Sequence, residues 1–275
     1  MNIGPKVGKK TALIPTETQS VGRQPAVLLF GDSHSDAVKR AVERRISLKL
    51  PIPLQVHRLL KTHWKSGQVI GDTSFDEFLE KIRGLSPDDI VLSMIGGNQH
   101  AVFSTVQHPV AFDFLEPVAE SMVEPGVEII PYRVISKLFG AGLQRGDMQA
   151  IEAIRRATSA RVVHIIPPPP KADSDFISRF HETVFAREGI DAQGVSPPSL
   201  RMKFWNLQTR LLQKLCKNIG VETLMPPHAG VEDGGFLARK YYAKDATHAN
   251  AQYGELILRE IDKLTQKRSG KRRTA

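Results

Sequence analysis

Short apolar runs alternate along the chain with segments in which apolar residues recur every three or four positions. The runs predict buried strands and the periodic segments predict amphipathic helices. The predicted strands are residues 26–30, 54–59, 90–95, 161–166 and 221–225. The predicted helices are residues 35–46, 75–83, 147–158, 200–219 and 251–264. This alternation predicts an α/β fold, with a parallel sheet covered by helices on both faces.

The sequence Gly31-Asp32-Ser33-His34 joins the first predicted strand to the first predicted helix. This position places Ser33 at the carboxyl end of a strand, beside the unpaired N–H groups of a helix's first turn. A nucleophile in an open α/β sheet is expected at such a turn. Asp and Ser before a helix also fit the simpler role of a helix cap.

The sequence Asp245-Ala246-Thr247-His248 precedes the last predicted helix. A spacing of three residues in a tight turn lets the Asp245 carboxylate reach the His248 imidazole. The carboxylate would then select the tautomer of the ring and leave its other nitrogen to face Ser33. Together the three residues form a nucleophile, a base and an orienting acid. The alternative is that Asp245 or Thr247 only caps the helix.

Two further turns supply candidate donors for an oxyanion. Gly71 opens the sequence Gly-Asp-Thr-Ser before a predicted helix, so its N–H can point outward with no side chain in the way. Asn98 ends the sequence Gly-Gly-Asn after a predicted strand, and its side-chain amide can donate over the same sheet edge. With the Ser33 N–H these make three donors around a developing negative oxygen. Alone, Gly-Asp-Thr-Ser is usually a turn and cap, and Gly-Gly-Asn is usually a loop, so their value lies in the joint order.

In this order the chain resembles the SGNH (GDSL-type) hydrolases, whose four sequence blocks contribute a Ser, a Gly, an Asn and a His. The matching residues are Ser33, Gly71, Asn98 and His248, and Asp245 matches the Asp three residues before the His. The resemblance implies a three-layer α/β/α sandwich with a flavodoxin-like five-stranded parallel sheet in the order 2-1-3-4-5. It also implies a serine esterase that forms an acyl-serine intermediate and needs no cofactor.

Two residues depart from the usual family pattern. His34 stands where many members have Leu, and Gln99 stands where the third block usually has Asp. The sequence therefore leaves open what supports Asn98, while Asp32 and His34 are expected to brace the nucleophile's turn. The Gly-Asp-Ser-His form resembles SGNH domains attached to polysaccharide O-acyltransferases. It favours a short acyl ester, such as an acetyl group on a carbohydrate, as the substrate.

Other functions remain open at this stage. An O-acyltransferase would use the same Ser-His-Asp site and pass the acyl group to a sugar hydroxyl. An SGNH-fold module would bind a glycan or partner without turnover, although Ser33, Asp245 and His248 are all present. A nucleotide-binding protein of this topology is disfavoured, because no glycine-rich phosphate loop follows the first strand.

One domain is predicted over residues 21–266, between a flexible segment at 1–20 and a basic, disordered tail at 267–275. Within it, residues 99–146 and 171–199 are too long for simple connections. Both leave the carboxyl ends of strands, where long connections often form lids or substrate walls. Local helical hairpins with their own small cores are the alternative.

Composition agrees with a single globular protein of 275 residues and limits its partners. Of the net charge of +9, the predicted tail carries +5 and residues 1–20 carry +2, so the rest is nearly neutral. Basic ends can contact nucleic acid or an anionic membrane surface, but a short basic end is more often simply solvated and disordered. No aromatic interleaving or zinc-ligand spacing points to specific nucleic-acid binding, and the sequence leaves the oligomeric state open. The lone Cys216 excludes an internal disulfide.

Neither a membrane span nor a secretory signal is evident, so a cytoplasmic location is expected. No metal is expected either, because four histidines that could act as ligands lack a common ligand spacing. These histidines are His100, His108, His164 and His181.

Overall fold

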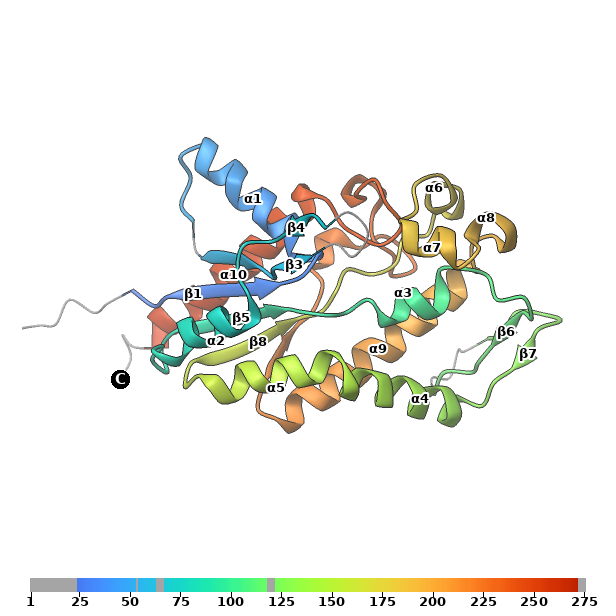
Figure 1. Ribbon diagram of the computed structural model, residues 1–275, viewed down its shortest axis with the longest axis horizontal. Helices are drawn as coiled ribbons and strands as arrows, with labels where there is room; N and C mark the ends of the chain where they lie inside the picture. The colour runs from blue at the N-terminus through green and yellow to red at the C-terminus, as the bar shows by residue number, and fades with distance from the viewer. Residues whose placement is uncertain (1–23, 53, 63–66, 118–121, 272–275) are drawn as a thin grey trace, which may run out of the picture.

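The computed structural model (Figure 1) describes residues 24–52, 54–62, 67–117 and 122–271, so the predicted segment at 1–20 lies outside it. Its centre is a five-stranded sheet in the order β2-β1-β5-β8-β9, with every neighbouring pair parallel. These strands are β1 (Val27–Gly31), β2 (Gln55–Arg58), β5 (Ile90–Met94), β8 (Arg161–Ile165) and β9 (Glu222–Leu224). All five predicted strands and the predicted order are confirmed.

Helices cover both faces of this sheet, which makes a three-layer sandwich (Figure 1). Side chains alternate along a strand, so Leu28 and Phe30 of β1 face one core while Val27 and Leu29 face the other. The first core is completed by α2 (Phe75–Arg83), α4 (Tyr132–Arg145), α5 (Asp147–Ala157) and α9 (Pro198–Asn218). The second core is completed by α1 (Ser35–Ser47) and α10 (Ala251–Lys271).

Helices α1 and α10 pack closely enough to require a glycine. A Cβ on Gly254 would lie 2.0 Å from the backbone oxygen of Ala37. The contact holds the start of α10 against the start of α1. It therefore links the segment that carries His248 to the helix that follows Ser33.

The two long segments contain more regular structure than the sequence pattern predicts. Residues 99–146 form α3 (Gln99–Ser104), β6 (Phe112–Asp113), β7 (Glu128–Ile129) and α4. Residues 171–199 form α6 (Ser174–Arg179), α7 (Thr183–Arg187), α8 (Ile190–Gln193) and the start of α9. Their contacts differ. Helix α4 packs into the first core, whereas Ile177, Phe185 and Ile190 form a small cluster with Ala101 and Ala246.

The remaining elements are short. They are the antiparallel pair β3 (Lys61–Thr62) and β4 (Val69–Ile70) and the 3₁₀ turns η1 (His228–Gly230) and η2 (Arg239–Tyr241). Helix α10 runs to Lys271 and so extends into the tail predicted at 267–275; residues 272–275 lie outside the described chain. Within the described ranges, no helix is both long and apolar enough to cross a membrane.

Candidate active site

The turn that carries Ser33 begins directly after β1. Helix α1 starts at Ser35 with His34 at the N-cap and no side-chain cap, so neither Asp32 nor Ser33 caps it. Asp32 Oδ2 instead accepts the N–H of Gly96 at 3.0 Å, which ties the ends of β1 and β5 together. Ser33 therefore stands at the carboxyl edge of the sheet with no structural role as a helix cap.

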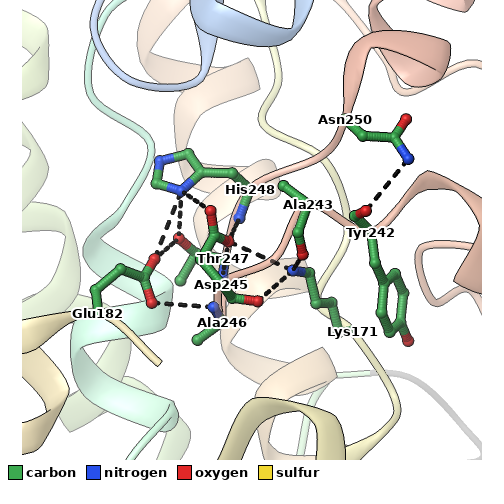
Figure 2. A network of polar contacts seen from close by, with 9 residues as sticks. All are labelled: Lys171, Glu182, Tyr242, Ala243, Asp245, Ala246, Thr247, His248 and Asn250. Atoms are coloured by element: carbon green, nitrogen blue, oxygen red, sulfur yellow. Dashed lines mark hydrogen bonds and ion pairs between the residues drawn. The ribbon is translucent and has the colours of Figure 1, made fainter. Parts of the chain in front are cut away.

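Asp245 holds His248 in the geometry that the sequence predicts (Figure 2). Its Oδ2 lies 3.0 Å from His248 Nδ1, and its Oδ1 accepts the N–H groups of Thr247 and His248 at 3.0 and 2.7 Å. The cap of α10 is a different residue, because Asn250 Oδ1 accepts the Gln252 N–H at 2.9 Å. The carboxylate of Asp245 thus orients the imidazole and does not cap the helix.

His248 lies against the turn that carries Ser33. The rings of His34 and His248 have centroids 4.9 Å apart. His248 Nε2 is buried and has no hydrogen-bond partner among the described residues, so a direct bond from Ser33 is not formed. The structure therefore brings His248 to the turn that carries Ser33, and the pairing of Ser33 with His248 stays a prediction.

His34 supplies the support for Asn98 that the sequence leaves open. His34 Nε2 lies 2.7 Å from Asn98 Oδ1. Burial, together with the nearby His248, lowers the pKa of His34, so the neutral ring donates from Nε2. Asn98 Nδ2 then stays available to donate elsewhere. Gln99 turns away and donates from Nε2 to the Phe139 carbonyl at 2.9 Å.

Gly71 occupies a site that only glycine fits. Its φ is +96°, and a Cβ there would lie 2.2 Å from the backbone oxygen of Leu59. Leu59 in turn donates its N–H to the Gly31 carbonyl at 2.8 Å, so the Gly71 turn lies beside the end of β1. Ser74 makes a capping box with Glu77 at the start of α2, which relieves Gly71 of that role. The direction of the Gly71 N–H toward an oxyanion stays a prediction.

A second carboxylate, which no sequence motif marks, lies beside the same imidazole. Glu182 Oε1 is 3.5 Å from His248 Nδ1 and accepts the Thr247 hydroxyl at 2.7 Å (Figure 2). Burial lowers the pKa of His248, but Asp245 and Glu182 outweigh it and raise that pKa to about 9. Two carboxylates therefore lie beside the His248 imidazole, where the sequence pattern marks only one.

Lys171 holds the segment that carries Asp245 through a buried ammonium group. Its side chain is fully buried, and its Nζ donates to the carbonyls of Ala243 and Asp245 and lies 3.4 Å from Asp245 Oδ1 (Figure 2). The rings of Phe176 and Tyr242 each lie 5.0 Å from Nζ. Burial raises the pKa of Asp245, but His248 and Lys171 hold it well below its usual range. The carboxylate is thus ionised at neutral pH.

We expect Lys171→Met to destabilise the protein by about 2–4 kcal/mol, because it leaves buried carbonyls and a carboxylate without their donor. Urea unfolding of the variant measures the loss. Lys214→Met, an exposed change on α9, is the matched control and should leave the free energy of unfolding within about 0.5 kcal/mol of the wild type. Equal stability of the two variants would contradict the anchoring role.

The acids around His248 also form a candidate ligand set. Among the described residues, Glu182, Asp245 and His248 place one possible ligand atom each within 4.8 Å of the others. However, Asp245 already accepts two backbone N–H groups, and Glu182 accepts the Ala246 N–H at 3.0 Å as well as the Thr247 hydroxyl. These contacts favour a hydrogen-bonded support for the imidazole over a cation site.

No family model and no curated protein matches the chain. Solved structures with a similar fold include a GDSL-like lipase from Bacteroides thetaiotaomicron, with 14% identity, a TM-score of 0.44 and 89% of each chain covered. A phospholipase A1 from Streptomyces albidoflavus has 13% identity and a TM-score of 0.44, with 86% of this chain and 99% of that chain covered. An extracellular lipase from Streptomyces rimosus has 15% identity and a TM-score of 0.44, with 86% and 98% covered. At identities this low, these likenesses do not assign a function to this chain.

Proposed function

We propose that the chain is a serine hydrolase that cleaves a carboxylic ester through an acyl-serine intermediate. One observation carries the proposal: an imidazole held at Nδ1 by a carboxylate beside the turn that presents Ser33, with Nε2 buried and without a hydrogen-bond partner in the described part of the chain. An oriented base next to a serine at the start of a helix is the arrangement that nucleophilic acyl transfer requires.

In the first half of the reaction, Ser33 Oγ attacks the ester carbonyl while His248 Nε2 takes the hydroxyl proton. The oxyanion is held by the N–H groups of Ser33 and Gly71 and by Asn98 Nδ2. The tetrahedral intermediate collapses, and His248 gives the proton to the departing alcohol. Asp245 stabilises the imidazolium throughout.

In the second half, water attacks the acyl-serine and His248 takes a proton from it. Collapse of this intermediate releases the carboxylic acid and returns the proton to Ser33 Oγ. The substrate that we propose is a short-chain ester, with an acetyl ester of a carbohydrate as the specific case. That choice is supported by the Gly-Asp-Ser-His form of the first block.

Covalent labelling tests the proposal without knowledge of the substrate. A fluorophosphonate probe should phosphonylate Ser33 Oγ with loss of fluoride, and peptide mass spectrometry should find the adduct on the peptide that contains Ser33. Protein unfolded in urea is the control and should not react. Absence of an adduct on Ser33 in the folded protein would count against an activated serine.

Asn98→Ala should lower kcat for ester hydrolysis by roughly 10²–10³-fold with a small change in KM, because a lost oxyanion donor weakens the transition state selectively. Steady-state kinetics with p-nitrophenyl acetate measure both constants. Asn218→Ala, at the far end of α9, is the control change. If Asn98→Ala kept the full kcat, Asn98 would not be an oxyanion donor.

A further inference from the structure

We propose that Glu182 is a second positioning acid for His248, so that two carboxylates from distant parts of the chain hold one catalytic base at Nδ1. This inference rests on the proposed function, in which His248 is the general base. It assigns a role in the reaction to the segment 171–199, which carries Glu182.

Both oxygens of the Glu182 carboxylate accept hydrogen bonds from the segment that carries His248. Oε2 accepts the N–H of Ala246 at 3.0 Å, and Oε1 accepts the hydroxyl of Thr247 at 2.7 Å. Thr247 Oγ1 is itself 3.3 Å from His248 Nδ1, and Oε1 is 3.5 Å from the same nitrogen. Figure 2 shows the Glu182 and Asp245 carboxylates converging on that one nitrogen.

Local helix chemistry does not explain this placement. Glu182 occupies the N-cap position of α7, where a side-chain oxygen ordinarily accepts an N–H of the first turn. No such bond is made, and the carboxylate is turned toward the segment that carries His248. Phe185 of α7 is buried in one cluster with Ala246, so packing holds the two segments together.

The titratable groups that face His248 come from four places. Asp245 lies on its own segment, with the ammonium group of Lys171 behind it. Glu182 faces it from the start of α7, and the neutral His34 faces it from the turn after β1, which also carries Asp32. Lys171 neutralises part of the charge on Asp245, so Glu182 supplies the additional negative charge that favours the imidazolium.

A titration of His248 by NMR, in protein labelled with ¹⁵N-histidine, tests the proposal independently of turnover. Glu182→Gln keeps the size of the side chain and removes its charge. We expect it to lower the pKa of His248 by about 1 unit, as loss of a charge at this distance does. The pH of half-maximal kcat/KM should fall by the same amount. Glu182→Asp, which keeps the charge, should restore part of both shifts.

Glu188→Gln is the matched control, since Glu188 is an exposed carboxylate on the same segment. It should change neither the pKa of His248 nor the pH profile. An unchanged pKa of His248 in folded Glu182→Gln would overturn the proposal. So would a shift of equal size in the control variant.

Asp245→Asn provides a second test that needs no change at Glu182. With Glu182 as the remaining acid, the pKa of His248 should stay above its ordinary value. Only the double variant, Asp245→Asn with Glu182→Gln, should bring it to the ordinary value or below. A pKa at or below the ordinary value in Asp245→Asn would overturn the role of Glu182. If the wild type hydrolysed no ester, the proposed function would fail, while both titrations would still decide how His248 is held.

Discussion

Ser33→Ala should abolish hydrolysis of p-nitrophenyl acetate, with kcat lower by roughly 10⁴–10⁶-fold. The hydroxyl is the only group lost, and no residual route through an acyl-enzyme exists without it. The fold should be unaffected, because Ser33 caps no helix. Steady-state kinetics and urea unfolding of the same preparation measure the two effects separately.

Ser47→Ala, at the exposed end of the same helix α1, is the matched control and should retain full activity. Substantial and equal rates in the wild type and Ser33→Ala would show that another residue is the nucleophile. An acyl-enzyme that forms on Ser33 but is not hydrolysed would identify the alternative chemistry, transfer of the acyl group to an acceptor hydroxyl.

For the wild type, kcat/KM should rise about tenfold per pH unit through neutrality and level off near pH 9. His248 accepts a proton only in its neutral form, and its pKa is raised to about 9. At pH 7 the rate should therefore be about a hundredfold below its alkaline limit. His248→Gln should lower kcat/KM by at least about 10⁴-fold and remove this pH dependence.

Protonation of His248 should also make the free energy of unfolding depend on pH, and this dependence runs opposite to that of the rate. The folded protein binds the His248 proton more tightly than the unfolded chain, so the stabilisation is complete below about pH 6.5 and is lost as the pH rises through about 9. The free energy of unfolding of His248→Gln should thus differ most from the wild type at pH 6. A wild-type rate that levels off near pH 7 would contradict a raised pKa of the base.

The sheet could be predicted from the sequence because its strands are buried on both faces. Such strands appear as continuous apolar runs, and proline or polar residues end them clearly. Helix α4 shows the limit of that approach. Its buried Ile135, Phe139 and Leu143 recur every four residues, a signal of a helix, yet the length of the segment and its prolines favoured an irregular connection.

Some residues of the candidate site could likewise be found from the sequence, and others could not. The blocks around Ser33, Gly71, Asn98 and His248 could be found because each joins a strand or turn to a helix at one sheet edge. Asp245 could be found because it reaches His248 within one turn. All of these are local patterns, or follow from the rule that parallel strands end together.

Glu182, Lys171 and the partner of Asn98 could not be found in this way. Glu182 and Lys171 act through contacts with the segment around Asp245 and His248, far along the chain. His34 meets Asn98 only when β1 and β5 pair. The sequence by itself therefore determined the strands, their edge and the residues able to react. Only tertiary packing decided the charges and hydrogen bonds that tune them, because these depend on distances between segments that no local pattern encodes.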